Sequence, residues 1–289
     1  MKDNILEIIN LCKSYGNFEL SDVNISLPRG YIMGFIGANG AGKTTTIKLI
    51  MNMIKKDSGE IRVFGKDHVK YELYIKNKVG YVSEQPVFYE NQTVAWNVNF
   101  AKKFYDEWDD ALFEDLLTRF NIDSSKKINQ LSKGMKMKTA LAIALSHRPE
   151  LLILDEPTSG LDPIVRDELL GILMEFIQDE SRSVFFSSHI TSDIEKIGDY
   201  VTFIDNGRII LSEEKDKILD EWKIVKGDIN LMNNYIKDLI GLEQTRTYFK
   251  ALVKDFDAFK AKYDISSLVI DKPTLDDVLL HLTKKENLR

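Results

Sequence analysis

Short runs of β-branched and aromatic residues recur along the chain between turn residues, and they predict strands. They occur in the segments ILEIINL, GYIMGFIG, EIRVFG, VGYVSE, LLILDEP and SVFFSSH. Helical patterns lie between the later runs, and this alternation favours an α/β domain with a parallel sheet. The early runs are short and separated by turns such as residues 28–30, so we expect an antiparallel subsheet beside the main one.

Two further patterns divide the chain. Residues 94–148 predict a mostly helical region, and the segment VTFIDNGRII predicts a hairpin around Asn206–Gly207 that closes the first domain. After about residue 212 the pattern changes to a charged helix in SEEKDKILDEW, a turn at Gly227, a helix near residues 230–240, and strands in TRTYFKALV and SSLVID. We interpret this last part as an α+β appendage of roughly 75 residues.

Composition narrows the class of protein. The 289 residues carry a net charge of -6, which argues against a protein that coats nucleic acid. The only cysteine is Cys12, so the chain forms no intrachain disulfide. The start, MKDNILEI, has acidic residues where a secretion signal needs an apolar core, and no window approaches the ~18 apolar residues of a spanning helix. We therefore expect a chain that does not cross a membrane by itself.

One segment has the pattern of a phosphate-binding loop. GFIGANGAGKTTTIKLI fits G-x-x-x-x-G-K-[ST] with Gly37, Gly40, Gly42, Lys43 and Thr44, after a predicted strand and at the start of a predicted helix. Glycines let backbone N–H groups close around phosphate oxygens, and the helix N-terminus adds a favourable dipole. The lysine would neutralise β- and γ-phosphate charge and the threonine hydroxyl would ligate Mg²⁺.

The segment LLILDEP supplies the acidic partners of that loop. Asp155 follows four apolar residues at the carboxyl end of a buried strand, where ligands of open sheets bind, and it can hold Mg²⁺ directly or through water. Glu156 comes next, and its carboxylate can polarise an attacking water as a general base. Alone, such an acidic pair would be a solvated turn; with the phosphate loop, it indicates nucleotide hydrolysis.

At this point the chain resembles the ATP-binding cassette (ABC) ATPases, and specifically the nucleotide-binding subunits of ABC transporters, over about residues 4–212. The motifs fall in the family's order. Tyr15 in KSYG resembles the aromatic that stacks on adenine, Gln85 in YVSEQP the Q-loop glutamine, LSKGM at 131–135 the signature, SGLD at 159–162 the D-loop, and His189 in FSSHI the switch histidine. Singly, Tyr15 could be a half-buried aromatic, Gln85 a strand-end polar residue and His189 a satisfied loop histidine.

The resemblance implies an α/β fold of the P-loop NTPase type, with an antiparallel β subdomain and a helical subdomain over about residues 88–148. The ATP-binding domain would span residues 1–212, and a small α+β accessory extension residues 213–289. The implied catalytic residues are Glu156, His189 and Gln85, and the implied Mg²⁺ ligands are Thr44, Gln85 and Asp155. The implied ATP contacts are Tyr15, Gly37, Asn39, Gly40, Ala41, Gly42, Lys43, Thr44, Thr45, Ser132 and Gly134.

The signature departs from the family pattern LSGGQ at two positions, Lys133 and Met135, and keeps Ser132 and Gly134. Backbone donors survive a change from glycine to lysine where φ stays negative. In the family, two cassettes pack head to tail, so this segment would contact an ATP bound mainly by the other chain. Lys133 could assist that contact, slow release, or simply face water. In the last case, Lys133, Lys136 and Lys138 would form a solvated face of the helix.

The resemblance also implies partners. The substrate path would belong to separate transmembrane permease subunits, with this chain in the cytoplasm on the inner face of the membrane, paired with a second cassette and not with nucleic acid. The aromatic stretch PVFYENQTVAWNVNFAKKFYDEW would receive the permease, or pack as helical core. The ending KPTLDDVLLHLTKK resembles exporter subunits linked to antimicrobial-peptide, drug and bacitracin resistance.

The competing interpretation is a soluble, non-transport ABC ATPase of DNA repair or translation. Repair members carry long coiled coils between the two Walker motifs, whereas Lys43 and Asp155 lie only 112 positions apart. Translation members generally carry two cassettes, and this chain has one. A pure assembly module without hydrolysis is opposed by the intact Lys43, Asp155, Glu156 and His189.

Overall fold

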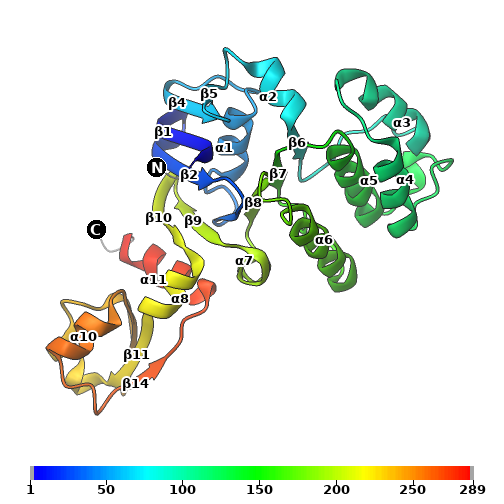
Figure 1. Cartoon of the computed structure of the whole chain (residues 1–289). Helices are drawn as coiled ribbons and strands as arrows, with labels where there is room; N and C mark the ends of the chain where they lie inside the picture. Colours follow the sequence, from blue (N-terminus) through cyan, green and yellow to red (C-terminus); the bar gives the residue numbers. More distant parts are fainter. Residues whose placement is uncertain (1–2, 287–289) are drawn as a thin grey trace.

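The computed structural model describes residues 3–286. Its centre is a six-stranded sheet in the order β10-β9-β3-β8-β7-β6, parallel except for β10 (Figure 1). All residues of β3 and β7 are buried, as expected for parallel strands covered on both faces. The strands are β3 (Ile32–Ile36), β6 (Val79–Val82), β7 (Leu151–Asp155), β8 (Ser183–Ser188), β9 (Tyr200–Asp205) and β10 (Arg208–Glu214).

A separate antiparallel sheet flanks the central one, as the sequence predicted. Its order is β2-β1-β4-β5, and helix α1 (Lys43–Ile50) shares a hydrophobic core with both sheets. Helix α2 (Glu72–Lys78) lies beside it, just before β6. The strands are β1 (Asn4–Tyr15), β2 (Phe18–Pro28), β4 (Ser58–Val63) and β5 (Lys66–Asp67).

The predicted helical region is also confirmed. It contains α3 (Val94–Ala101), α4 (Asp110–Arg119) and α5 (Lys133–Ser146), with short 3₁₀ turns at Lys102–Phe104 and Ile128–Gln130. Each α-helix starts after a residue whose side-chain oxygen caps it, namely Thr93, Asp109 and Ser132. Helix α6 (Pro163–Phe176) joins this region to the sheet.

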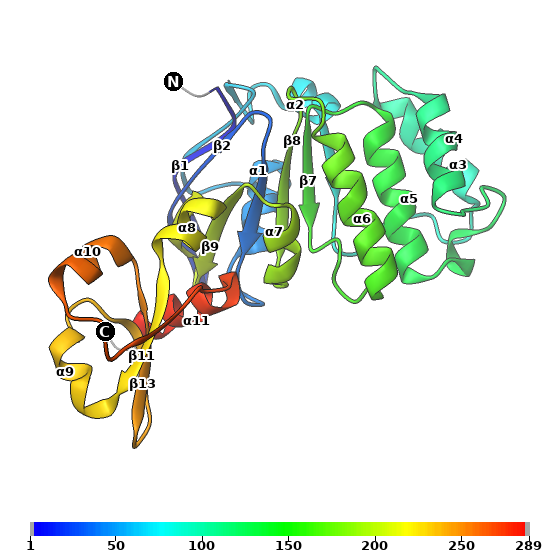
Figure 2. The ribbon, with the colours of Figure 1, turned by 60° about the horizontal axis from the view of Figure 1, so that its bottom comes forward.

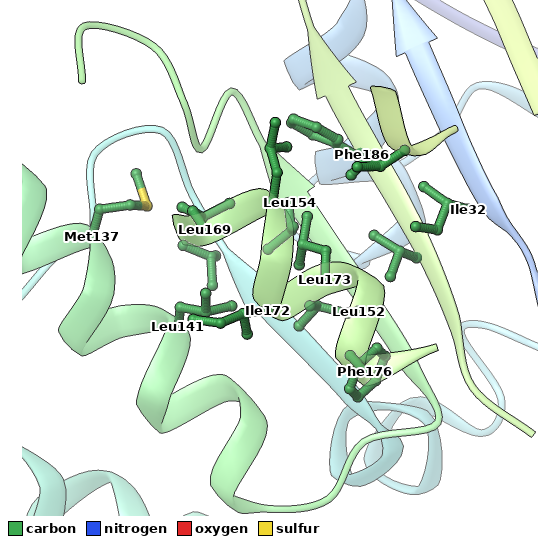
Figure 3. Packing of buried hydrophobic residues seen from close by; sticks show 14 of the residues in the cluster. Ile32, Met137, Leu141, Leu152, Leu154, Leu169, Ile172, Leu173, Phe176 and Phe186 are labelled. Carbon is green, nitrogen blue, oxygen red and sulfur yellow. The ribbon is translucent and has the colours of Figure 1, made fainter. Parts of the chain in front are cut away.

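Figure 3 shows how α5, α6 and the central sheet share one core. Met137 and Leu141 of α5 lie toward α6, and Leu169 and Ile172 of α6 lie between them and β7. All four side chains are buried. The first turns of α5 and α6 are thereby held next to each other, close to the carboxyl end of β7.

The predicted hairpin joins β9 to β10. Asn206 and Gly207 have φ values of 43° and 75°, which suits the Asn-Gly pair because both central residues of a type I′ turn need positive φ. The hairpin also supports the phosphate loop, since the amide of Gly207 donates to the carbonyl of Ala41 at 3.0 Å.

The appendage is a four-stranded antiparallel sheet in the order β12-β13-β11-β14, set at the opposite end of the molecule from α3, α4 and α5 (Figure 2). One face packs on α9 and α10, and α11 returns to the first domain, where the amide of Leu275 donates to Glu195 at 2.6 Å. Helix α7 (Thr191–Ile197) carries Glu195. The remaining elements are α8 (Lys215–Glu221), β11 (Lys223–Asp228), a 3₁₀ turn (Ile229–Leu231), α9 (Met232–Tyr235), β12 (Ile240–Gln244), β13 (Tyr248–Val253), α10 (Phe256–Lys262), β14 (Val269–Asp271) and α11 (Leu275–Glu286).

Three local predictions in this part are wrong. Gly227 lies within β11, opposite Phe249, and not in a turn; a β-carbon there would lie 2.9 Å from the Phe249 ring, so the glycine makes room for the aromatic. The charged helix begins only at Lys215, because residues 212–214 extend β10 along β9. The helix near 230–240 ends at Tyr235, and a strand occupies 240–244.

Candidate nucleotide-binding site

The phosphate-binding pattern lies where the sequence predicted, between β3 and α1. Gly42 caps α1 with φ at 116°, and a β-carbon there would lie 2.6 Å from Leu20. Only glycine meets both conditions without strain. The loop therefore opens the N-terminus of α1 toward a cavity of about 670 Å³. The residues that line this cavity are Phe18, Asn39, Gly40, Gly42, Lys43, Thr44, Thr45, Glu84, Glu156, Ser159 and His189.

Lys43 is turned inward in this structure. Its ammonium donates to the carbonyls of Gly37 at 2.6 Å and Ala38 at 3.2 Å, and it lies 3.0 Å from Oε1 of Glu156. Lys43 and Glu156 are each only 5% exposed. A buried charge needs such partners, and a phosphate entering the cavity would offer the lysine a new one.

Glu156 is held in position by its backbone and by His189. Its φ of 51° lies in the left-handed region, which is uncommon for a residue with a side chain. Its amide donates to the hydroxyl of Ser187 at 3.0 Å, and its Oε2 lies 2.6 Å from Nδ1 of His189. The structure thus brings Lys43, Glu156 and His189 together on one wall of the cavity, as a group able to orient a water beside bound phosphate.

Asp155 lies behind this wall. It is 2% exposed and accepts a hydrogen bond from Ser187 at 2.8 Å, so the same serine orients both carboxylate residues. Burial, followed by the negative charge of Asp155, raises the pKa of Tyr81 to about 12. The Tyr81 phenol therefore stays neutral beside the acidic group.

The oxygen donors around the cavity fit Mg²⁺. Thr44 and Glu84 line it, and Asp155 lies at the end of β7. Among residues 3–286 no three or more His, Cys, Asp or Glu side chains cluster to hold a metal ion by themselves. That arrangement suits Mg²⁺, which binds through one or two carboxylates and takes its other ligands from water and nucleotide phosphates.

Two predicted contacts lie beside the cavity lining. Tyr15 is 46% exposed and sits opposite Phe18 in the β1–β2 hairpin, and Phe18 is the aromatic that lines the cavity. Gln85 faces a neighbouring hollow, while Glu84 lines the nucleotide cavity. The sequence reasoning overlooked Phe18 and Glu84, and it named the SGLD segment without giving its Ser159 a contact with the nucleotide. Glu84 is adjacent to Gln85 and Phe18 is close to Tyr15, which is the signal that could have found them.

The signature residues lie away from this chain's own cavity. Ser132 caps α5 by accepting from the amide of Met135 at 3.2 Å. Gly134 packs on α6, where a β-carbon would lie 3.3 Å from Val165. Neither residue lines the cavity described above.

Comparison with known proteins decides the family. A family model described as ABC transporter matches residues 20–159. A lantibiotic transport ATP-binding protein of Streptococcus pyogenes is 37% identical over 215 residues, which cover 73% of this chain and 92% of the relative. The chain belongs to the ABC transporter family of ATP-binding proteins. This confirms the predicted family, the P-loop NTPase fold and the ATPase activity, and the non-transport alternative is not favoured.

Other relatives of this ABC cassette cover different shares of the chain. A bacitracin transport ATP-binding protein of Bacillus licheniformis is 37% identical over 209 residues, covering 71% of this chain and 68% of the relative. An ABC transporter ATP-binding protein of Bacillus subtilis is 28% identical over 264 residues, covering 90% of both chains and therefore reaching into the appendage. A solved ATP-binding subunit of an ABC transporter superposes with a TM-score of 0.67 at 30% identity, covering 75% of this chain and 92% of that one.

Proposed function

We propose that this cassette binds MgATP in the 670 Å³ cavity and powers export of a peptide or drug-like substrate through separate transmembrane subunits. The observation that carries the proposal is the group formed by Lys43, Glu156 and His189 on one wall of that cavity. The names of the bacitracin and lantibiotic relatives support the class of substrate.

On nucleotide binding, Lys43 would exchange its contact with Glu156 for the β- and γ-phosphates. This exchange releases a carboxylate that already points into the cavity and is still held by His189 at 2.6 Å. Glu156 can then accept a proton from the attacking water, while His189 fixes its orientation. Thr44, Asp155 and either Gln85 or Glu84 would hold Mg²⁺, which supplies charge neutralisation at the phosphates.

A second cassette would complete the site. Ser132 and Gly134 lie outside this chain's own cavity, which supports their proposed contact with an ATP bound by the other cassette. Phe18 or Tyr15, on neighbouring positions of one hairpin, would stack on adenine. Because the γ-phosphate would contact both chains, binding favours the closed pair and hydrolysis releases it.

The permease would dock in an aromatic groove of about 480 Å³ beside α3. Trp96 and Phe100 stack with ring centroids 5.5 Å apart, and Tyr89 meets the Trp96 ring edge-on at 4.9 Å. Phe104 continues the row and is 67% exposed. Trp108 of the same stretch instead packs against the main core, and Phe88 packs against that core and also lines the groove. The exposed rings suit an interface with a membrane subunit.

A membrane location follows from this docking and not from the chain itself. Within residues 3–286, no helix is long and apolar enough to span a bilayer. We propose that the cassette is a cytoplasmic protein that is held on the inner face of the membrane by the permease.

Replacing the proposed base tests this function. The variant Glu156→Gln should bind ATP and lose turnover by about 10² to 10⁴-fold, because an amide cannot accept the proton from water. Glu90→Gln is the matched control: Glu90 pairs with Lys136 outside the cavity lining, so turnover should stay within about twofold of the unmodified chain. Normal hydrolysis by Glu156→Gln would remove Glu156 from the proposed role.

A further inference from the structure

The first turn of α5 contacts the loop that follows Glu156 within the same chain. The ammonium of Lys133 donates to the carbonyl of Ser159 at 2.7 Å. The next residue, Gly134, packs on Val165 at the start of α6. Two motifs that the sequence suggested only separately, LSKGM at 131–135 and SGLD at 159–162, therefore touch each other.

The loop at 159–162 is also part of the nucleotide cavity. Ser159 lines the cavity, and its amide donates to the carbonyl of Glu156 at 3.1 Å. Before it, the hydroxyl of Thr158 is buried and donates to Asp193 at 2.6 Å. The loop is thus fixed on the side of Thr158, and Lys133 supplies the side-chain contact to its outer part.

Lys133 differs from the two lysines that follow it. Lys136 and Lys138 pair with the carboxylates of Glu90 and Glu168. Lys133 is the first residue of α5, where a positive charge is disfavoured by the helix dipole. Its hydrogen bond to a backbone carbonyl can offset this unfavourable interaction, whereas a lysine that only faced water would gain no such contact.

We propose that Lys133 is a positioning residue that ties the signature turn to the Ser159 loop, so that Ser132 and the wall of the chain's own ATP cavity shift together. The inference rests on the proposed function of two paired cassettes. It adds a connection within one chain between the segment that would serve the partner's ATP and the segment that borders its own. The contact lies within one chain, so it can be tested without pairing of two cassettes.

The first test measures amide hydrogen exchange in the nucleotide-free protein. The amides of Ser159 and Leu161 donate to carbonyls within the loop. In Lys133→Met, which keeps the apolar stem and loses the donor, their exchange should become about 3- to 10-fold faster. Lys133→Arg should restore slow exchange. Lys136→Met, about one turn later in α5, should leave exchange in the loop unchanged.

This measurement separates the tether from a purely local effect. The charge of Lys133 could instead act only by destabilising α5 through the helix dipole. In that case Lys133→Met would slow amide exchange within α5 and leave exchange in the loop unaltered, and the proposal would be overturned. The proposal would also be overturned if Lys133→Arg increased exchange in the loop as much as Lys133→Met.

The second test measures turnover. Lys133→Met should lower kcat about 3- to 10-fold with KM for ATP within about twofold, because no phosphate contact is removed, and Lys133→Arg should restore kcat. Unchanged kcat in Lys133→Met would overturn the positioning role. A chain that shows the predicted exchange pattern but no hydrolysis before any substitution would uphold the tether and contradict the proposed function.

Discussion

Glu156 is shared between two side chains on the cavity wall. Lys43 contacts one of its carboxylate oxygens and His189 the other. The positive φ of Glu156 keeps the side chain on the cavity wall while these partners are in place. In the proposed mechanism, ATP binds beside a carboxylate that His189 already orients, and Lys43 can contact phosphate in place of Glu156.

Two adjacent residues compete for the role of metal ligand. The resemblance predicts Gln85, whereas Glu84 is the one that lines the nucleotide cavity. If Glu84 ligates Mg²⁺, then Glu84→Ala should reduce the preference for MgATP over Mg²⁺-free ATP by about tenfold, as measured by calorimetry. Gln85→Ala should leave that preference within about twofold. The reverse pattern would instead favour Gln85.

The sequence predicts which residues belong to the site better than it predicts which of their side chains face the cavity. The glycines, Lys43 and Thr44 could be predicted because the loop pattern itself sets their geometry. Which of Glu84 and Gln85, or of Tyr15 and Phe18, faces the cavity depends on the local course of a loop and a hairpin. The sequence carries little information about that.

At the scale of elements, the C-terminal end of α5 contains a buried histidine. His147 caps the helix and stacks on Tyr105 with centroids 3.9 Å apart. Burial lowers the pKa of His147 to about 4, below its usual 6.5. Between about pH 6.5 and pH 4, His147 is therefore protonated in the unfolded chain and neutral in the folded chain. The free energy of unfolding falls as pH drops through this range.

This shift predicts a measurable difference between two variants. Between pH 7 and pH 5 the unmodified chain should lose about 2 kcal/mol more unfolding free energy than His147→Phe, which cannot titrate. Urea unfolding at both values of pH gives the comparison. Equal losses in the two proteins would show that His147 stays solvated enough to be protonated in the folded state.

Gly227 offers a second test at this scale. A β-carbon there would lie 2.6 Å from Leu268 and 2.9 Å from Phe249, so Gly227→Ala should lower the unfolding free energy by about 1–3 kcal/mol. Gly171 in α6 has no neighbour within 4 Å of an added β-carbon, so Gly171→Ala should instead stabilise by about 0.5–1 kcal/mol. Denaturant unfolding of both variants checks the pair. Stabilisation by Gly227→Ala would contradict the close approach of Leu268 and Phe249 to this residue.

Strands β3 and β7 could be predicted because each is a short, largely apolar run that is buried on both faces. The appendage was harder, since its short strands alternate and its boundaries depend on pairing partners far along the chain. Gly227 shows the reason: the residue is a turn signal locally, and only the Phe249 ring opposite it explains why it sits in a strand.

At the scale of the whole molecule, helix α3, which contributes residues to the aromatic groove, and the appendage lie at opposite ends (Figure 2). Phe104→Asp should weaken co-purification with the transmembrane subunit at least about tenfold, because a charge would enter an apolar interface, while ATP binding persists. Val269→Asp in β14 is the control, with a side chain that is 60% exposed at the distant end. Equal retention of the permease by both variants would place the docking surface elsewhere.

The central claim is that ATP joins two cassettes, each completing the other's site. Analytical ultracentrifugation of Glu156→Gln tests it most directly. With saturating ATP the species should have twice the 33.2 kDa mass of the chain, and with ADP the single mass. Adding Ser132→Arg should abolish the ATP-dependent pair, because a bulky side chain would occupy the place of the partner's phosphate. A single mass for Glu156→Gln at saturating ATP would contradict the account.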